Sequence, residues 1–241
     1  MAKRQLKSIE DYLAYGDAVV GRSKTGLPTP LKPPAKAFAA AHASYTKAAR
    51  AVEAARMERD HALALVTEAD TVLDKNVLRL ADAMVAAGLG TRMKPLAKFS
   101  SLPPSRLTDQ PYKIEAELVK KMVTAISRAK PDARVKAACA TCASNATAVE
   151  RALAAVTAPQ AAYSRALAAR DALLPEWNKR LATLQKYSAV VWDENPGALS
   201  ALFARPEPIQ APTKKRAKKK LASSTNGQTA PATTGMDAPQ S

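Results

Sequence analysis

The stretch AKAFAAAHASYTKAARAVEAARMERDHALALVTEADTVLDKNVLRLADAMVAA, residues 35–87, is the most informative part of the chain because it contains neither glycine nor proline. The alanine, leucine and charged residues that dominate it are good helix formers, whereas the two missing residues are the strongest helix breakers. The stretch therefore predicts one long helix, which we place at residues 35–88.

Within this stretch, positions separated by alternating steps of three and four residues run from Phe38 to Leu73, and alanine occupies every second one of them. Apart from Arg59, the remaining positions are apolar. A 3.5-residue repeat is the pattern of a left-handed coiled coil, and alanine lets a facing backbone approach closely. We call this series the alanine seam. It predicts a second helix packed along the first.

Residues 131–195 carry a matching repeat with larger side chains, which runs from Val135 to Val191. These larger residues can face the alanine seam, so the sequence predicts an all-α fold, an elongated antiparallel helical bundle or coiled coil with an Ala-rich seam. Pro159 and Pro175 fall inside the second repeat and predict a kink or a split in that helix.

Composition divides the rest of the chain. Residues 1–34 are expected to form a short N-terminal helix and a linker, and residues 35–203 the helical bundle. Inside the bundle, a proline-rich loop at residues 88–111 and a short basic amphipathic helix at residues 112–130 connect the two long helices. Residues 204–241 have few large apolar side chains and many small polar ones, so they predict a disordered lysine-rich tail.

The short helix predicted at residues 112–130 has an apolar and a basic side. The predicted apolar stripe is Ile114, Leu118, Met122 and Ile126. The cations on the opposite side are Lys113, Lys120, Lys121 and Arg128. This helix is therefore a candidate polyanion-binding element.

The net charge of the 241-residue chain is +16, and its distribution is uneven. Residues 35–90 hold seven basic and seven acidic groups, whereas residues 91–134 hold ten basic and four acidic groups. The tail concentrates its charge in one run of six cations, which are Lys214, Lys215, Arg216, Lys218, Lys219 and Lys220. In composition, this run resembles the basic tails of linker histones and of nucleoid-associated proteins.

Near-matches to chemical motifs do not predict an enzyme. Cys139 and Cys142 have C-x-x-C spacing but lie on the second seam, so we interpret them as buried structural thiols. Glu58 and His61 have the spacing of a di-iron helix pair, but they flank the alanine seam and no second such pair exists in the sequence. We therefore predict no catalytic residue, no metal site and no cofactor.

The sequence favours a non-enzymatic helical protein that binds nucleic acid or another polyanion non-specifically, through the cationic tail and the basic helix. The alternative is a structural or adaptor coiled-coil protein that forms a homo-oligomer or scaffolds a partner helix. No membrane span is expected, because no apolar stretch of about 18 residues lacks charged side chains. We expect a cytoplasmic, or nucleoid-associated, location.

Overall fold

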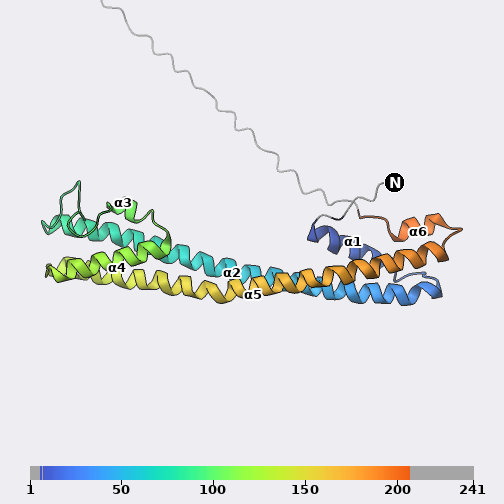
Figure 1. Cartoon of the computed structure of the whole chain (residues 1–241). Coiled ribbons are helices and arrows are strands. Elements are labelled where there is room, and N and C mark those ends of the chain that lie inside the picture. Colours follow the sequence, from blue (N-terminus) through green and yellow to red (C-terminus); the bar gives the residue numbers. More distant parts are fainter. Residues whose placement is uncertain (1–5, 7, 207–241) are drawn as a thin grey trace, which may run out of the picture. The chain divides into compact units, whose positions relative to one another are not determined.

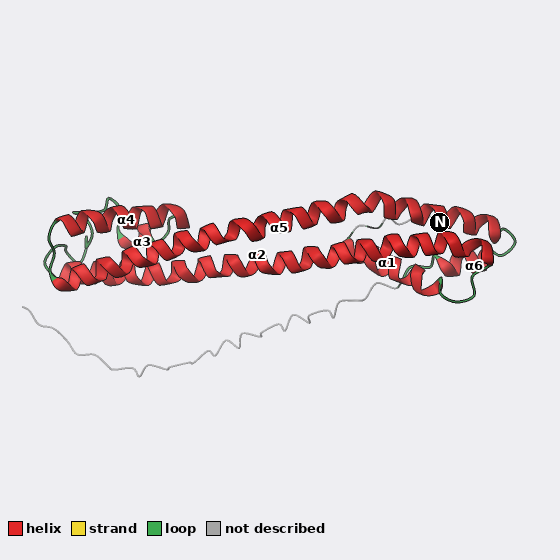
Figure 2. Cartoon of the chain, turned by 90° about the horizontal axis from the view of Figure 1, so that it is seen from below, coloured by secondary structure: helices red, strands yellow, loops and turns green. Residues whose placement is uncertain are grey.

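The computed structural model describes residues 6 and 8–206, and the predicted tail with its lysine run lies outside the described residues. No β-strand occurs in the described part of the chain (Figure 2), which confirms the all-α class. The helices are α1 (Ile9–Arg22), the 3-10 helix η1 (Thr29–Leu31), α2 (Lys32–Ala86), α3 (Pro104–Leu107), α4 (Tyr112–Arg128), α5 (Ala133–Val191) and α6 (Pro196–Leu202).

Helices α2 and α5 lie side by side and run in opposite directions (Figures 1 and 2). They contain 55 and 59 residues, so at a rise of about 1.5 Å per residue each is roughly 80–90 Å long. Phe38 near the start of α2 meets Trp177 near the end of α5, with 5.3 Å between ring centroids. The predicted elongated antiparallel bundle is confirmed.

The alanine seam faces α5 along its whole length. Its residues are all buried or half-buried, with Val52, Ala62 and Val66 the most enclosed in the middle of α2. In α5, by contrast, no residue between Val149 and Trp177 is buried. We call residues 46–66 of α2 and 150–176 of α5 the two-helix bridge, because two helices alone enclose little of each other's surface.

Shorter helices thicken the bundle at both ends of the bridge. At one end, α4 and the loop that carries α3 cover α2 and α5 and complete what we call the α4 core (Figure 1). Its largest buried residues are Leu73, Leu80, Met84, Leu96, Leu107 and Ile126. At the other end, α1 completes the α1 core, which contains Tyr15, Val19, Phe38, Tyr45, Trp177 and Leu184.

A buried histidine connects the three helices of the α1 core. His42 of α2 is 4% exposed, its Nδ1 accepts a hydrogen bond of 3.1 Å from the indole Nε1 of Trp177, and its Nε2 lies 2.9 Å from Asp17 Oδ1. Because indole N–H only donates, Nδ1 is the acceptor and Nε2 carries the proton that reaches Asp17. The α1 residue opposite the ring is Gly16, which leaves room for it.

The start of α1 and the end of α2 have local chemistry that is typical of helix ends. Ser8 and Asp11 form a capping box at the start of α1, with two hydrogen bonds of 3.1 Å. Gly88 ends α2 in the left-handed region at φ 69°, where its N–H reaches the Val85 carbonyl oxygen at 3.0 Å.

Two details of the second long helix differ from the prediction. Helix α5 begins after Asp132, whose carboxylate accepts a 2.8 Å hydrogen bond from Val135 N, and not at Pro131. It also continues through Pro159 and Pro175 without a break. The seam contacts on either side of each proline hold the helix together despite the lost backbone hydrogen bond.

The chain after α5 folds back in an element that the sequence did not predict. The side chain of Asn195 accepts a 3.1 Å hydrogen bond from Ala198 N and so caps α6. The guanidinium of Arg22, at the end of α1, donates to the Leu202 carbonyl oxygen at 3.3 Å. The two termini of the described body are thus joined at the α1 core.

Candidate functional site

The predicted polyanion-binding residues divide into two groups. The lysine run lies outside the described residues, and the other four lie on α4. Lys113, Lys121 and Arg128 are exposed, as expected. Lys120 is half-buried, and its Nζ forms an ion pair with the Glu150 carboxylate of α5. Three of the four predicted α4 cations therefore remain open to a ligand.

Cations gather over the whole end of the molecule that holds the α4 core. Residues 91–136 include eleven lysine and arginine residues, ten of them exposed. Within the described part of the chain, Arg106 pairs with Asp109 at 3.8 Å and Lys120 with Glu150, and the other nine have no carboxylate within ion-pair distance. We call these nine the basic end: Arg92, Lys94, Lys98, Lys113, Lys121, Arg128, Lys130, Arg134 and Lys136.

A second feature of this end is acidic and enclosed. Asp70 and Asp74, one turn apart on α2, face Glu115 in the first turn of α4. One carboxylate oxygen from each of the three residues lies within 4.8 Å of the others. Glu115 is fully buried, the two aspartates are half-buried, and neither Glu115 oxygen meets a hydrogen-bond donor among the described residues. We call these residues the carboxylate cluster.

The surroundings strongly favour the uncharged form of the central acid. Burial is the main reason that the pKa of Glu115 rises to about 9, and the negative charges of Asp74 and Asp70 add to it. Burial also raises the pKa of Asp70, with a further contribution from Asp74. At neutral pH, without a bound cation, Glu115 therefore carries a proton.

The cluster is not evident from the sequence, because the apolar stripe predicted for α4 differs from the side that is buried. Of the four residues in the predicted apolar stripe, Met122 and Ile126 are buried but Ile114 is 46% exposed. Since α4 packs against α2 as well as α5, its buried side is rotated to include Glu115 and Ala116. In the sequence, the only indication of the cluster is the i, i+4 spacing of Asp70 and Asp74 beside the alanine seam.

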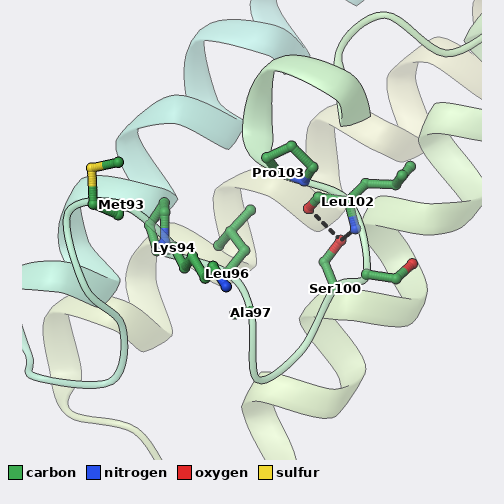
Figure 3. Close-up of a pocket in the computed structure, with 9 residues that line it drawn as sticks. Met93, Lys94, Leu96, Ala97, Ser100, Leu102 and Pro103 are labelled. Carbon is green, nitrogen blue, oxygen red and sulfur yellow. Dashed lines mark hydrogen bonds between the residues drawn. The ribbon is translucent and has the colours of Figure 1, made fainter.

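The loop between α2 and α4 holds a surface pocket of about 380 Å³ (Figure 3). Ser100 shapes it, since its hydroxyl donates to the Leu102 carbonyl oxygen at 2.9 Å and accepts from Leu102 N at 3.1 Å. Lys94 is the only ionisable residue in its lining. The pocket therefore combines a cation with apolar walls but has no acid–base pair of its own.

The residues of the C-x-x-C spacing are buried free thiols, as the sequence predicts. Burial raises the pKa of Cys142 to about 12, so its sulfur remains protonated and unreactive at neutral pH. Glu58 and His61 are exposed on α2. Neither pair contributes to the carboxylate cluster.

The described residues thus define an all-α protein built on one long antiparallel helix pair, with a basic end and a buried carboxylate cluster at that same end. No family model, curated protein or solved structure matches the chain. No helix in the described part of the chain has the length and hydropathy needed to cross a membrane.

Proposed function

We propose that the protein is non-enzymatic and binds polyanions, above all the phosphate backbone of nucleic acids, through its basic end and through Lys214–Lys220. The observation that carries the proposal is the set of nine exposed cations in residues 91–136 that have no carboxylate partner among the described residues. A lysine or arginine that is not neutralised within the protein can contact a phosphate and release a condensed counterion. The protonated Glu115 leaves the local charge more positive than the sequence alone suggests.

The proposed binding does not depend on base sequence. Reading of single-stranded bases relies on aromatic side chains on which bases stack. Between residues 91 and 136, Tyr112 is the only exposed aromatic residue. The ligand is therefore expected to be recognised by charge, and the affinity should fall steeply with salt.

The test measures binding of the full chain to unrelated 30-base-pair duplexes across a range of salt concentrations. Replacing Lys113, Lys121 and Arg128 together by glutamine removes three cations and conserves helix propensity. If each of them contacts one phosphate, the log–log salt slope becomes shallower by about 2 to 3. The loss should be equal for all duplex sequences.

A matched control removes the same charge far from the basic end. Lys36, Lys47 and Arg50 are exposed on α2, also without an ion-pair partner among the described residues. Their replacement by glutamine should leave the slope nearly unchanged. Equal losses in the two triple variants would reject a role specific to the basic end. A loss confined to a variant without the cations of Lys214–Lys220 would assign binding to the tail alone.

A different observation favours self-association as a second candidate function. The two-helix bridge leaves large apolar side chains in solvent, with Met57 64% exposed, Leu63 45% and Leu65 46%. Packing of a second copy along the bridge would bury Met57 and Leu65, which are eight residues apart and so lie on one side of α2, in the manner of a four-helix bundle. Sedimentation equilibrium of the wild type and of the Met57→Lys, Leu65→Lys double variant tests this. A monomer at high micromolar concentration would exclude self-association.

A further inference from the structure

We propose that the carboxylate cluster is a binding site for a divalent cation that prefers oxygen ligands, with Asp70, Asp74 and Glu115 as its protein ligands. The cation would join α2 to the first turn of α4. This inference is independent of polyanion binding.

The geometry fits such an ion. Ca²⁺ takes oxygen ligands at about 2.3–2.6 Å, so two ligands on opposite sides of it are separated by about 4.6–5.2 Å and adjacent ones by less. The oxygens of the cluster, which lie within 4.8 Å of one another, are therefore close enough to share one ion. Asp70 and Asp74 are spaced i, i+4, so both side chains lie on the same side of α2.

The burial of Glu115 is the observation that distinguishes this cluster from an ordinary acidic surface. Its side chain is 0% exposed, and it points at the two aspartates with both oxygens unpartnered. One oxygen of each aspartate is also buried without a donor. Buried polar atoms are nearly always satisfied by a protein group, a water molecule or an ion. The proton on Glu115 supplies a single donor for these four oxygens, whereas a bound cation would contact all three residues.

In the described part of the chain, no lysine or arginine supplies a countercharge to these oxygens. The sequence contains 37 lysine and arginine residues, yet in the described part of the chain none forms an ion pair with the cluster. The basic residue of α4 that does reach inward, Lys120, is paired with Glu150. A small divalent cation can supply the positive charge that no described lysine or arginine side chain provides.

The donor set indicates the class of ion. All ligands are carboxylate oxygens, and the cluster has no histidine nitrogen or cysteine sulfur, which favours Ca²⁺, Mn²⁺ or Mg²⁺ over Zn²⁺ and Cu²⁺. The half-buried aspartates leave one side of the cluster open to solvent. Water molecules on that side would complete the coordination shell and provide the route by which the ion enters.

The experiment uses the full chain, first treated with EDTA and then dialysed at pH 7.5. Binding of Mn²⁺ is followed by loss of the free-ion EPR signal, and thermal unfolding is followed by circular dichroism with and without 1 mM Ca²⁺. We expect one tight Mn²⁺ per chain, and a rise in Tm of at least about 3 °C with Ca²⁺. Absence of saturable Mn²⁺ binding below millimolar concentration would overturn the proposal.

Two variants and a control locate the ion. Glu115→Gln keeps the shape of the side chain but cannot provide a carboxylate ligand, so Mn²⁺ affinity should fall at least about tenfold and the Ca²⁺-dependent rise in Tm should vanish. Glu117→Gln, an exposed change two residues away on α4, should alter neither. Unchanged Mn²⁺ affinity in Glu115→Gln would place the ion elsewhere and reject the site. Should that variant fail to fold, Asp74→Asn decides by the same two readouts.

Discussion

Replacing Gly16 by alanine tests the packing of the α1 core. A Cβ atom at this position would lie 2.2 Å from both Cε1 and Nδ1 of His42, whereas non-bonded atoms normally approach to about 3.5–4.0 Å. The imidazole is held by its hydrogen bonds to Trp177 of α5 and Asp17 of α1, so it can move only by breaking them. The variant must either shift α1 or displace the ring.

The expected destabilisation has three contributions. Overpacking of a buried site costs about 1–3 kcal/mol. Displacement of His42 leaves the indole N–H of Trp177 buried without an acceptor, at a further cost of about 1–3 kcal/mol. The higher helix propensity of alanine returns up to about 1 kcal/mol. The free energy of unfolding should therefore fall by about 1 to 6 kcal/mol.

Gly21→Ala is the matched control, because it lies on the same helix and its Cβ would have nothing within 4 Å. It should be neutral, or more stable by up to about 1 kcal/mol. Urea unfolding followed by tryptophan fluorescence is the suitable assay, since Trp177 lies in the α1 core and Trp192 ends α5 near it. Equal urea midpoints for Gly16→Ala and Gly21→Ala would refute the close contact between α1 and His42.

Two further predictions concern the α4 core. In EDTA, the folded protein keeps the proton of Glu115 up to a pKa of about 9, whereas the unfolded chain loses it near 4.5. The free energy of unfolding should thus fall as pH rises from about 5 to 9, by up to about 1.4 kcal/mol per pH unit. Urea unfolding of Glu115→Gln should lack this slope. Identical pH profiles for the two proteins would contradict the assignment of the proton to Glu115. Cys142, whose pKa is about 12, should react with a thiol reagent at pH 8 at least about 100-fold more slowly in native protein than in urea. Equal rates in the two states would show that the thiol is accessible in the native protein.

The long helices could be predicted because their signals are local and repeated. The alanine seam repeats its pattern over five heptads, and every position in the repeat predicts the same buried side of α2. The end of α2 at Gly88 depends on one residue whose φ is positive. Pro159 and Pro175 do not split α5, because the cost of an interrupted turn is small beside the packing of a 59-residue helix.

The features that the sequence did not predict depend on contacts between distant segments. Which side of the 17-residue helix α4 is buried is fixed by two neighbouring helices at once, and a shift of the buried side by one residue exchanges Ile114 for Glu115. Within its own segment, Gly16 only lowers the helix propensity of α1. The structure shows that its missing side chain makes room for the His42 ring. Neither feature has a periodic signal in the chain.

The carboxylate cluster lies where the third helix of the α4 core begins. The Tyr112 hydroxyl, at the start of α4, is 3.5 Å from the Thr67 hydroxyl, just beyond the two-helix bridge. No side chain among the described residues caps this end of α4, so the first backbone N–H groups of the helix favour negative charge nearby, whereas burial of Glu115 opposes it. A proton on Glu115 removes the cost of burying a charge. A bound cation would offset that cost and also keep the negative charge near the start of α4. The attachment of α4 to α2 is therefore coupled to what occupies the cluster, at the boundary between the packed end of the molecule and the bridge.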